Sequence, residues 1–336
     1  MRFALSPDQE AFRDAVDDLL GKACPPSVVR AAWEAPAGAL DRAVWDDLAG
    51  MGVLSVLVPE DQGGLGLDET FLVPLLEACG RAALPHPVVE TAMVAAPLLG
   101  ADAGMVSTDL GGPNVPCAAD ADVLLLRDGP GLVRTSPGEV GLRPVDTVDR
   151  SRRAARVERH PGEAAGQATP ATGRGTVAAA GPAVTDDPAA IELAFDRGAL
   201  GTAAVLLGFA QAMLDQTVAY VRERHQFGVP VGSFQAVKHH CADVALALEH
   251  ARPVVWRAAW SIAHDLPSRS RDVSAAKAMA DGAVDCAGRA ALQCHGAIGY
   301  TVEADLHLFL KRSWALTRAW GDTAFHTDRV ADALMP

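Results

Sequence analysis

The sequence lacks the paired cysteines and the basic clusters that would point to metal, disulfide or nucleic-acid chemistry. Its cysteines form no CxxC pair, which excludes a zinc ribbon or a disulfide framework and predicts reduced thiols inside apolar patterns. Lys and Arg number 29 against 42 Asp and Glu, and the resulting net charge of −13 argues against a nucleic-acid partner. The six cysteines are Cys24, Cys79, Cys117, Cys241, Cys286 and Cys294.

Long apolar runs are also missing. We find no stretch with the length of a membrane span, and the first residues lead into a helical pattern instead of a signal peptide. The chain has 336 residues, 49% of them hydrophobic and 21% charged, which fits a large globular core or two to three packed subdomains. We therefore expect a cytoplasmic protein without a membrane partner.

Several catalytic signatures are absent as well. No Gly-x-Ser-x-Gly elbow supports a hydrolase, and no paired Glu-x-x-His motifs support a di-iron bundle. His239 and His240 lie near Asp243, but adjacent histidines point about 100° apart on a helix and cannot face one ion. We predict no metal site.

Hydrophobic periodicity predicts helices at both ends of the chain and a small β region between them. Ser6 caps a first helix, further helices follow over 40–51, 68–79 and up to Leu99, and residues 1–105 form the first domain. Residues 106–187 form a reduced β domain with strands at 123–126, 131–134 and 140–145. Arginines at 150–159 are interpreted as a solvated strand edge or loop, and 160–187 as a loose connection or a frayed strand pair.

Residues 188–336 are predicted to be a helical bundle, with helices over 188–225, 233–264, 270–292 and 302–319 and a last one after Asp322. The tryptophans of these helices are interpreted as core or subunit-contact residues. The first two long helices meet in a reversal, where Gly228 and Pro230 end one helix and Ser233 is the expected cap of the next. This reversal brings Arg224, an aromatic side chain, an amide and free helical N–H groups together, which suits a phosphate-bearing aromatic ligand. Spacing alone favours the simpler alternative, a helical hairpin with ordinary capping.

Three motifs in this order resemble the acyl-CoA dehydrogenase family over nearly the whole chain. They are Val58–Leu67 (VPEDQGGLGL), Arg224–Gln235 (RHQFGVPVGSFQ) and Gln293–Thr301 (QCHGAIGYT). The resemblance implies a mainly α fold in which a small central β domain is flanked by an N-terminal helical domain and a C-terminal four-helix bundle. It also implies FAD as cofactor and α,β-dehydrogenation of an acyl-CoA thioester as activity.

The resemblance further implies which residues meet FAD. Arg224 would contact the pyrophosphate with Gln226 and Phe227 beside it, Gln235 would lie close by, and Gln293 with Gly296 would form a turn against the adenosine. In the family these groups touch the FAD held by a neighbouring subunit. A permanent guanidinium charge and glycines that let the backbone approach a phosphate agree with these roles.

Two departures from the family pattern are evident. The carboxylate base of the family would stand at Gly198, or at Trp320 or Gly321, and neither place holds a carboxylate. We interpret the nearby Asp196 and Asp322 as structural, the latter as a helix N-cap. No catalytic residue is therefore identified.

The second departure is the central region, where nothing between Val106 and Thr185 matches the Thr-Glu-Pro-x-Ala-Gly-Ser-Asp-like segment that holds the flavin ring. Both departures resemble the base-lacking subunit of actinobacterial heterotetrameric acyl-CoA dehydrogenases. The implied partners are an acyl-CoA with a bulky acyl group such as a steroid side chain, a second dehydrogenase-like subunit or another copy of this chain, and an electron-transfer flavoprotein. Two alternatives stay open: a homomeric biosynthetic flavoenzyme with altered chemistry, and a non-catalytic scaffold without flavin.

Overall fold

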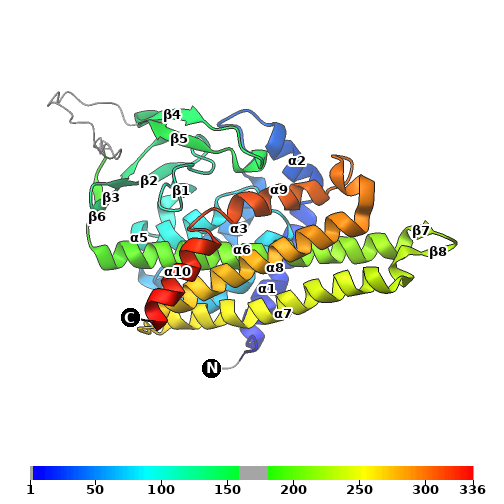
Figure 1. The fold of residues 1–336 in the computed structure, drawn as a ribbon. Coiled ribbons are helices and arrows are strands. Elements are labelled where there is room, and N and C mark those ends of the chain that lie inside the picture. The colour runs from blue at the N-terminus through cyan, green and yellow to red at the C-terminus, as the bar shows by residue number, and fades with distance from the viewer. Residues whose placement is uncertain (1–2, 159–180, 336) are drawn as a thin grey trace, which may run out of the picture.

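The computed structural model describes residues 3–158 and 181–335. Its helices form the body of the molecule, and a small β region lies at one end of it (Figure 1). This arrangement confirms the predicted mainly α fold with a small central β region. The boundaries predicted after residues 105 and 187 stay a prediction. The helices are α1 Pro7–Ala23, α2 Pro26–Glu34, α3 Ala43–Gly50, α4 Glu69–Arg81, the π-helix η3 Val89–Ala95, α5 Ala96–Leu99, α6 Pro188–Glu223, α7 Gln235–Ala263, α8 Arg269–His295, the 3₁₀ helix η8 Gly296–Tyr300, α9 Leu306–Leu316 and α10 Thr323–Leu334.

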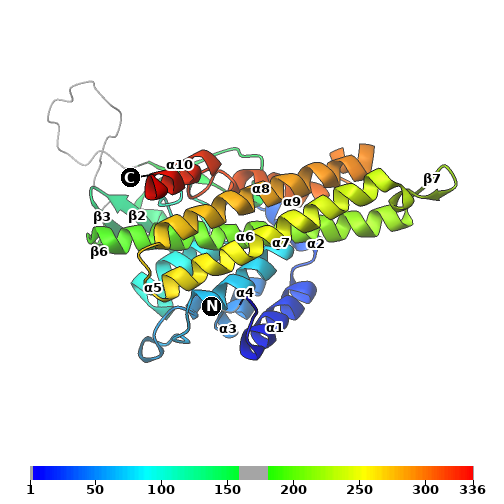
Figure 2. The same ribbon diagram turned by 60° about the horizontal axis from the view of Figure 1, so that its bottom comes forward.

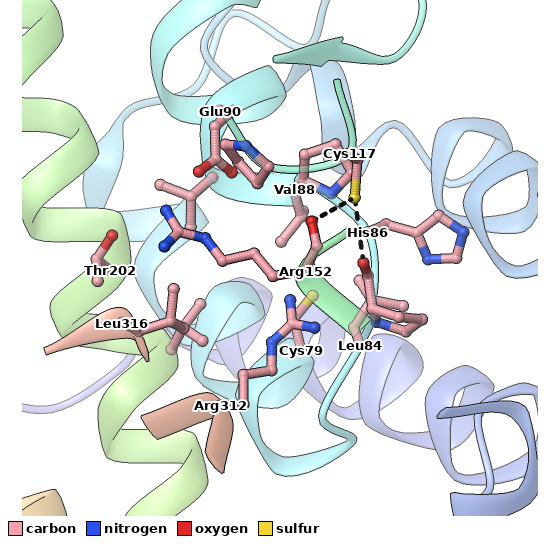
Figure 3. A pocket seen from close by; sticks show the side chains of 15 residues that line it. Cys79, Leu84, His86, Val88, Glu90, Cys117, Arg152, Thr202, Arg312 and Leu316 are labelled. Carbon is pink, nitrogen blue, oxygen red and sulfur yellow. Dashed lines mark hydrogen bonds between the residues drawn. The ribbon is translucent and has the colours of Figure 1, made fainter. Parts of the chain in front are cut away.

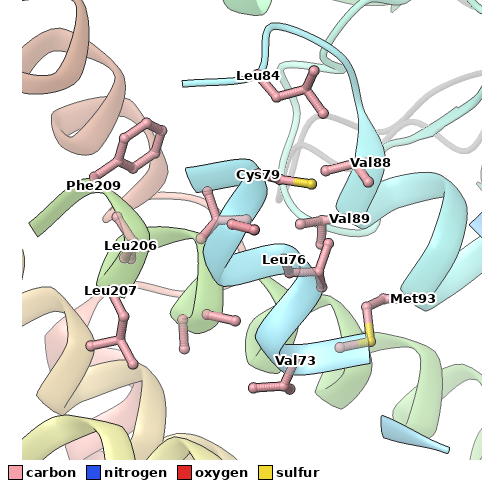
Figure 4. Packing of buried hydrophobic residues seen from close by; sticks show 14 of the residues in the cluster. Val73, Leu76, Cys79, Leu84, Val88, Val89, Met93, Leu206, Leu207 and Phe209 are labelled. Carbon is pink, nitrogen blue, oxygen red and sulfur yellow. The ribbon is translucent and has the colours of Figure 1, made fainter. Parts of the chain in front are cut away.

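Helix α6 is the axis of the fold. The N-terminal helices α1, α3 and α4 lie on one side of it, and α8 and α10 lie on the other (Figure 2). The crossing of α4 and α6 is close because glycines face the partner backbone: a Cβ on Gly80 would lie 2.1 Å from the Val205 carbonyl oxygen, and one on Gly208 would lie 2.1 Å from the Glu77 carbonyl oxygen. Met93 and Leu76, both members of the cluster in Figure 4, approach α6 at Gly201, where an added Cβ would lie 2.9 Å from Met93 Cγ and 3.2 Å from Leu76 Cδ1. Both terminal regions of the sequence thus share one hydrophobic core.

The apolar centre of α6 is the one segment of the described residues that is long and apolar enough to span a membrane, contrary to the expectation of none. However, 83% of its most apolar window is buried inside the fold. Helix α6 is therefore a core helix, whose apolar character comes from contacts on every side.

The β region contains a four-stranded sheet and a separate hairpin. Strand β1 (Val106–Thr108) pairs in parallel with β2 (Val123–Asp128), which pairs antiparallel with β3 (Gly131–Thr135), and β3 pairs with β6 (Ala183–Thr185). Strands β4 (Gly141–Pro144) and β5 (Ala155–Glu158) form the hairpin. The predicted strands correspond to β2, β3 and β4. The sequence patterns missed β1, which is only three residues long. Strand β5 lies in the run interpreted as a strand edge or loop, and β6 lies in the segment interpreted as a loose connection or a frayed strand pair, most of which is outside the described residues.

The basic run is not a solvated edge throughout, which corrects the interpretation made above. Arg153 is 6% exposed and forms an ion pair of 2.8 Å with the buried Asp120, and it donates to the Ala35 carbonyl at the end of α2. Arg152 lines an internal cavity. Only Arg150 and Arg156 are exposed as expected, and Arg159 lies outside the described residues. The run therefore anchors the β region to the N-terminal helices.

Candidate functional site

The reversal between α6 and α7 forms an open groove at the far end of the bundle. Helix α6 ends at Glu223, and strands β7 (His225–Gln226) and β8 (Val229–Pro230) form a short hairpin that projects beyond the helices (Figure 1). The groove has a volume of about 420 Å³. Its lining comes from the hairpin, the start of α7 and the end of α8: Tyr220, Arg224, Gln226, Phe227, Val231, Phe234, Ala236, Val237, His240, Gln293, Cys294, His295, Gly296 and Ala297.

Five of the six predicted cofactor residues therefore line one groove, although the two motifs that supply them are almost seventy positions apart. Gln235 is the exception. It is the first residue of α7 and exposed, but its amide Nε2 lies 3.1 Å from His239 Nε2 instead of lining the groove. Ser233 is not the N-cap of α7, which corrects a second expectation. Phe234 holds that position, and the Ser233 hydroxyl donates to the Pro230 carbonyl at 2.7 Å, because a 3₁₀ turn precedes the helix.

The hairpin turn holds an aromatic residue in a costly conformation. Phe227 and Gly228 have φ angles of +55° and +81°, the pattern of a type I′ turn. A left-handed conformation costs a bulky residue about 1–3 kcal/mol, which is usually tolerated at sites with a functional reason. The Phe227 side chain is 92% exposed and makes an edge-to-face contact with Phe234 at 6.2 Å between ring centroids. An exposed aromatic in a strained turn is suited to contact a ligand or another subunit.

The floor of the groove is neutral and its rim is cationic. Tyr220 stacks on His295 with ring centroids 4.5 Å apart, and burial lowers the pKa of His295, so this imidazole is neutral at pH 7. Within the described part of the chain Arg224 has no ion-pair partner, and its guanidinium is exposed. Gly296, at φ +63°, opens the end of α8 for close approach of a ligand. Sequence reasoning missed Tyr220 and His295 as part of the groove; Tyr220 stands one helical turn before Arg224, the spacing that could have indicated it.

The two positions at which the resemblance implies a base lie together in the interior, and an indole fills the space between them. Trp320, which follows α9, is 1% exposed. A Cβ on Gly198 would lie 2.4 Å from Trp320 Cε3, and one on Gly111 would lie 2.7 Å from Cε2 of the same ring. Since two glycines flank the ring, no side chain fits at Gly198 while Trp320 is in place.

Gly321 is equally closed to a side chain. Its φ is +89°, and a Cβ there would lie 2.4 Å from Phe325 Cδ1. The preceding Trp320 has φ +59°, its N–H donates to the Gly111 carbonyl at 2.9 Å, and its own carbonyl lies 2.8 Å from His326 Nε2. The segment is thus fixed on both sides, and the described residues leave no room for a carboxylate at either base position.

A buried carboxylate that the sequence did not single out lies beside this indole. Glu90 of η3 is 7% exposed, and burial raises its pKa, while Arg152 and a hydrogen bond with Trp320 act in the opposite direction. Figure 3 shows the guanidinium of Arg152 directed toward Glu90 inside a cavity that Arg312 also lines. The cavity volume of about 30 Å³ admits a water molecule or two but no acyl thioester. Glu90 cannot act on such a substrate in this structure.

The other carboxylates near the base positions have structural partners. Asp196 is fully buried and forms ion pairs with Arg269 at 3.1 Å and Arg329 at 2.9 Å, which tie α6 to α8 and α10. Asp322 accepts from the Phe325 N–H at 3.0 Å and is the N-cap of α10, as predicted.

Comparisons with known proteins agree with this geometry. Residues 6–102 match the acyl-CoA dehydrogenase N-terminal domain, and residues 189–335 match the acyl-CoA dehydrogenase C-terminal domain. The chain is 31% identical over 328 residues to the acyl-CoA dehydrogenase IpdE2 of Mycolicibacterium smegmatis, covering 92% of this chain and 93% of that protein. It is 29% identical to IpdE2 of Mycobacterium tuberculosis, covering 91% of each.

Solved structures share the fold. The Tcur3481-Tcur3483 steroid ACAD G363A variant aligns with a TM-score of 0.81 at 24% identity, over 97% of each chain. The ChsE4-ChsE5 complex from Mycobacterium tuberculosis aligns with a TM-score of 0.84 at 22% identity, over 99% of each chain. At these identities the structural similarity shows that the fold is shared and no more. The sequence identity to IpdE2 shows common descent. The chain belongs to the acyl-CoA dehydrogenase family.

Proposed function

We propose that this chain is a subunit of a heteromeric acyl-CoA dehydrogenase that completes the FAD site of a partner subunit and has no working active site of its own. The single observation that carries this proposal is the indole of Trp320, packed between Gly111 and Gly198 where the family has its base. A chain that acted on an acyl-CoA by itself would need a carboxylate and space for the thioester at this place. Two structurally similar proteins are the Tcur3481-Tcur3483 steroid ACAD and the ChsE4-ChsE5 complex, which supports a heteromer acting on a bulky acyl-CoA.

The groove fits a flavin dinucleotide held mainly by another subunit. Arg224 is a permanent cation without a carboxylate partner among the described residues, and it lies with Gln226 and Phe227 beside an exposed surface. Bound FAD would accept the hydride from the β-carbon of the substrate. The residues of this chain would orient its pyrophosphate and adenosine: Arg224 by charge, Phe227 by ring contact, and Gln293 with Gly296 by amide and backbone N–H groups. Gln235 is one residue from the groove lining and would assist from its edge.

The partner subunit would supply the base for α-proton abstraction, a contribution of roughly 10²–10⁴-fold to the rate. It would also supply the flavin-holding β segment. An electron-transfer flavoprotein is the proposed acceptor of the electrons. No carboxylate of this chain is assigned a catalytic role.

Co-expression tests the proposal. We expect the chain to be colourless when purified alone and to form a yellow, active complex with a dehydrogenase-like partner that carries the base. A chain that is yellow, homomeric and active on an acyl-CoA with an artificial acceptor would contradict the proposal and favour a homomeric flavoenzyme. A flavin-free complex would favour the scaffold alternative.

A further inference from the structure

A second groove with a different chemistry lies between α2 and α9. Its volume is about 490 Å³, and it shares no lining residue with the groove at the α6–α7 reversal. Arg30 of α2 bridges its two walls through a 2.7 Å ion pair with Asp305 and a hydrogen bond to the Val302 carbonyl. The segment around Arg150, which follows β4, forms the third side. We refer to it as the α2–α9 groove.

The charge of the α2–α9 groove opposes that of the molecule. Three cations line it, Arg30, Arg150 and Lys311, against one carboxylate, Glu34. Arg30 is neutralised by Asp305, but in the described ranges 3–158 and 181–335 neither Arg150 nor Lys311 has an ion-pair partner. A chain with a net charge of −13 thus leaves two cations unpaired on one concave surface. Such a surface attracts an anion with at least two charges.

The same groove presents two indoles. Trp314 of α9 is 48% exposed, so one of its faces is available for stacking. Trp33 carries Lys311 Nζ over its ring at 5.1 Å, and its Nε1 is enclosed without a hydrogen-bond partner among the described residues. The contact between Lys311 and Trp33 places this cation at the aromatic wall of the groove.

The histidine in this groove is not a further cation. His307 Nδ1 lies 2.7 Å from the Ala304 carbonyl, and its ring meets Trp33 edge-on at 5.4 Å between centroids. Burial lowers the pKa of His307, and Arg30 and Lys311 act in the same direction. Since Nδ1 donates to the carbonyl, Nε2 is left as an acceptor in the neutral ring.

We propose that the α2–α9 groove binds a purine nucleotide with two or more phosphate charges. The base stacks on Trp314, and the phosphates lie between Arg150 and Lys311. An exposed indole beside two unpaired cations favours a flat anion over an acidic peptide, which offers no ring to stack. The assignment is independent of the proposed flavin function, because it uses none of the same residues.

Calorimetric titration with ADP tests this assignment on the purified chain, or on its complex with a partner if the chain needs one. We expect saturable binding that weakens as salt is raised, that falls roughly tenfold or more in the double variant R150A/K311A, and that falls roughly tenfold in W314A. Arg289 of α8 has a side chain that is 80% exposed, its ion-pair partner among the described residues is Asp285, and it does not line the groove, so R289A is the matched surface control and should bind like the wild type.

The groove at the α6–α7 reversal could also take ADP, and R224A separates the two sites. Binding that survives R224A and is lost in R150A/K311A supports the α2–α9 groove. Absence of saturable binding to the wild type, or binding lost in R224A and unchanged in R150A/K311A, would overturn it. Pyrophosphate that binds as tightly as ADP would overturn the nucleotide assignment, because the stacked base would then contribute nothing. Circular dichroism and thermal unfolding establish that each variant is folded.

Discussion

The two regions where this family places its chemistry have opposite character in this chain. The groove at the α6–α7 reversal is open, with an exposed Phe227 in a left-handed turn and an unpaired Arg224 within the described residues. The base region is closed, with Trp320 packed between Gly111 and Gly198. Open and strained sites are retained where something binds, whereas filled and well-packed ones contribute stability. The comparison separates the groove proposed for the cofactor from a region that its own packing fills.

The largest expected effect comes from restoring a carboxylate inside the closed region. Gly198→Glu forces a side chain into the Trp320 ring and buries a charge, and we expect a loss of about 4 kcal/mol or more in the free energy of unfolding, without a gain of activity. Denaturant unfolding measures the change. Gly282→Glu is the matched control, since Gly282 is exposed on α8 with nothing within 4 Å of a Cβ. Equal stability of the two variants would show that the base region is not closed.

Substitution of Arg224 in the open region should change flavin binding and leave the free energy of unfolding unchanged. Arg224→Ala removes the free guanidinium, and we expect the FAD content of the complex to fall roughly tenfold or more at limiting flavin, since hydrogen bonds to a charged group contribute about 1.5–3 kcal/mol. The neighbouring exposed Arg222, which does not line the groove, provides the control variant Arg222→Ala. Absorbance of bound flavin per subunit is the measurement. Unchanged occupancy in Arg224→Ala would remove the main assignment of the site.

Acid should lower the free energy of unfolding, in part through a histidine of the closed region. Burial lowers the pKa of His326 to about 4, although its bond to the Trp320 carbonyl acts against the shift. Because the unfolded chain takes up this proton near pH 6.5 and the native chain does not until about pH 4, stability falls as the pH drops through that interval. His326 alone contributes at most about 1.4 kcal/mol per pH unit. His86, with a pKa also lowered to about 4 by burial, adds a second such term.

Unfolding curves between pH 7 and 5 measure this dependence. We expect His326→Asn to reduce the slope of stability against pH by the contribution of one histidine and to lower stability at pH 7. His86→Asn is the comparison, because His86 Nε2 contacts the Asp41 carbonyl instead of the Trp320 carbonyl. A slope that His326→Asn leaves unchanged would show that His326 is not neutral in the native state.

The sequence predicted the open region far better than the closed one, for a physical reason. Arg224, Gln226 and Phe227 lie within four residues of each other, so local turn chemistry brings them together whatever the rest of the chain does. Trp320 meets Gly198 across more than a hundred residues, and only the packing of α9 against α6 creates that contact. Patterns could indicate that the base was missing, but they could not reveal that an indole had taken its place.

The local predictions that were wrong also depended on contacts that the local sequence pattern does not show. The arginines at 152 and 153 have the composition of a surface run, and only the nearby Asp120 and Glu90 explain their burial. Ser233 has the chemistry of an N-cap, but its hydroxyl closes the preceding 3₁₀ turn instead. Long helices were found at nearly their observed bounds because their periodicity extends over many turns, whereas three-residue strands carry almost no pattern of their own.

The smallest expected effect comes from substitutions of Phe227. They compare the two regions directly, because the free energy of unfolding should rise while FAD binding falls. Phe227→Gly relieves the left-handed conformation at φ +55°, and we expect the free energy of unfolding to rise by about 1 kcal/mol at most, since glycine also loses more chain entropy on folding. Phe227→Asn tolerates the same φ without that entropic cost and provides the matched variant. In both, the FAD content of the complex should fall, because the exposed ring is lost. A gain in stability with unchanged flavin binding would mean that the strained aromatic serves another contact, and a loss of stability in both variants would mean that Phe227 is held by packing and not by a bound ligand.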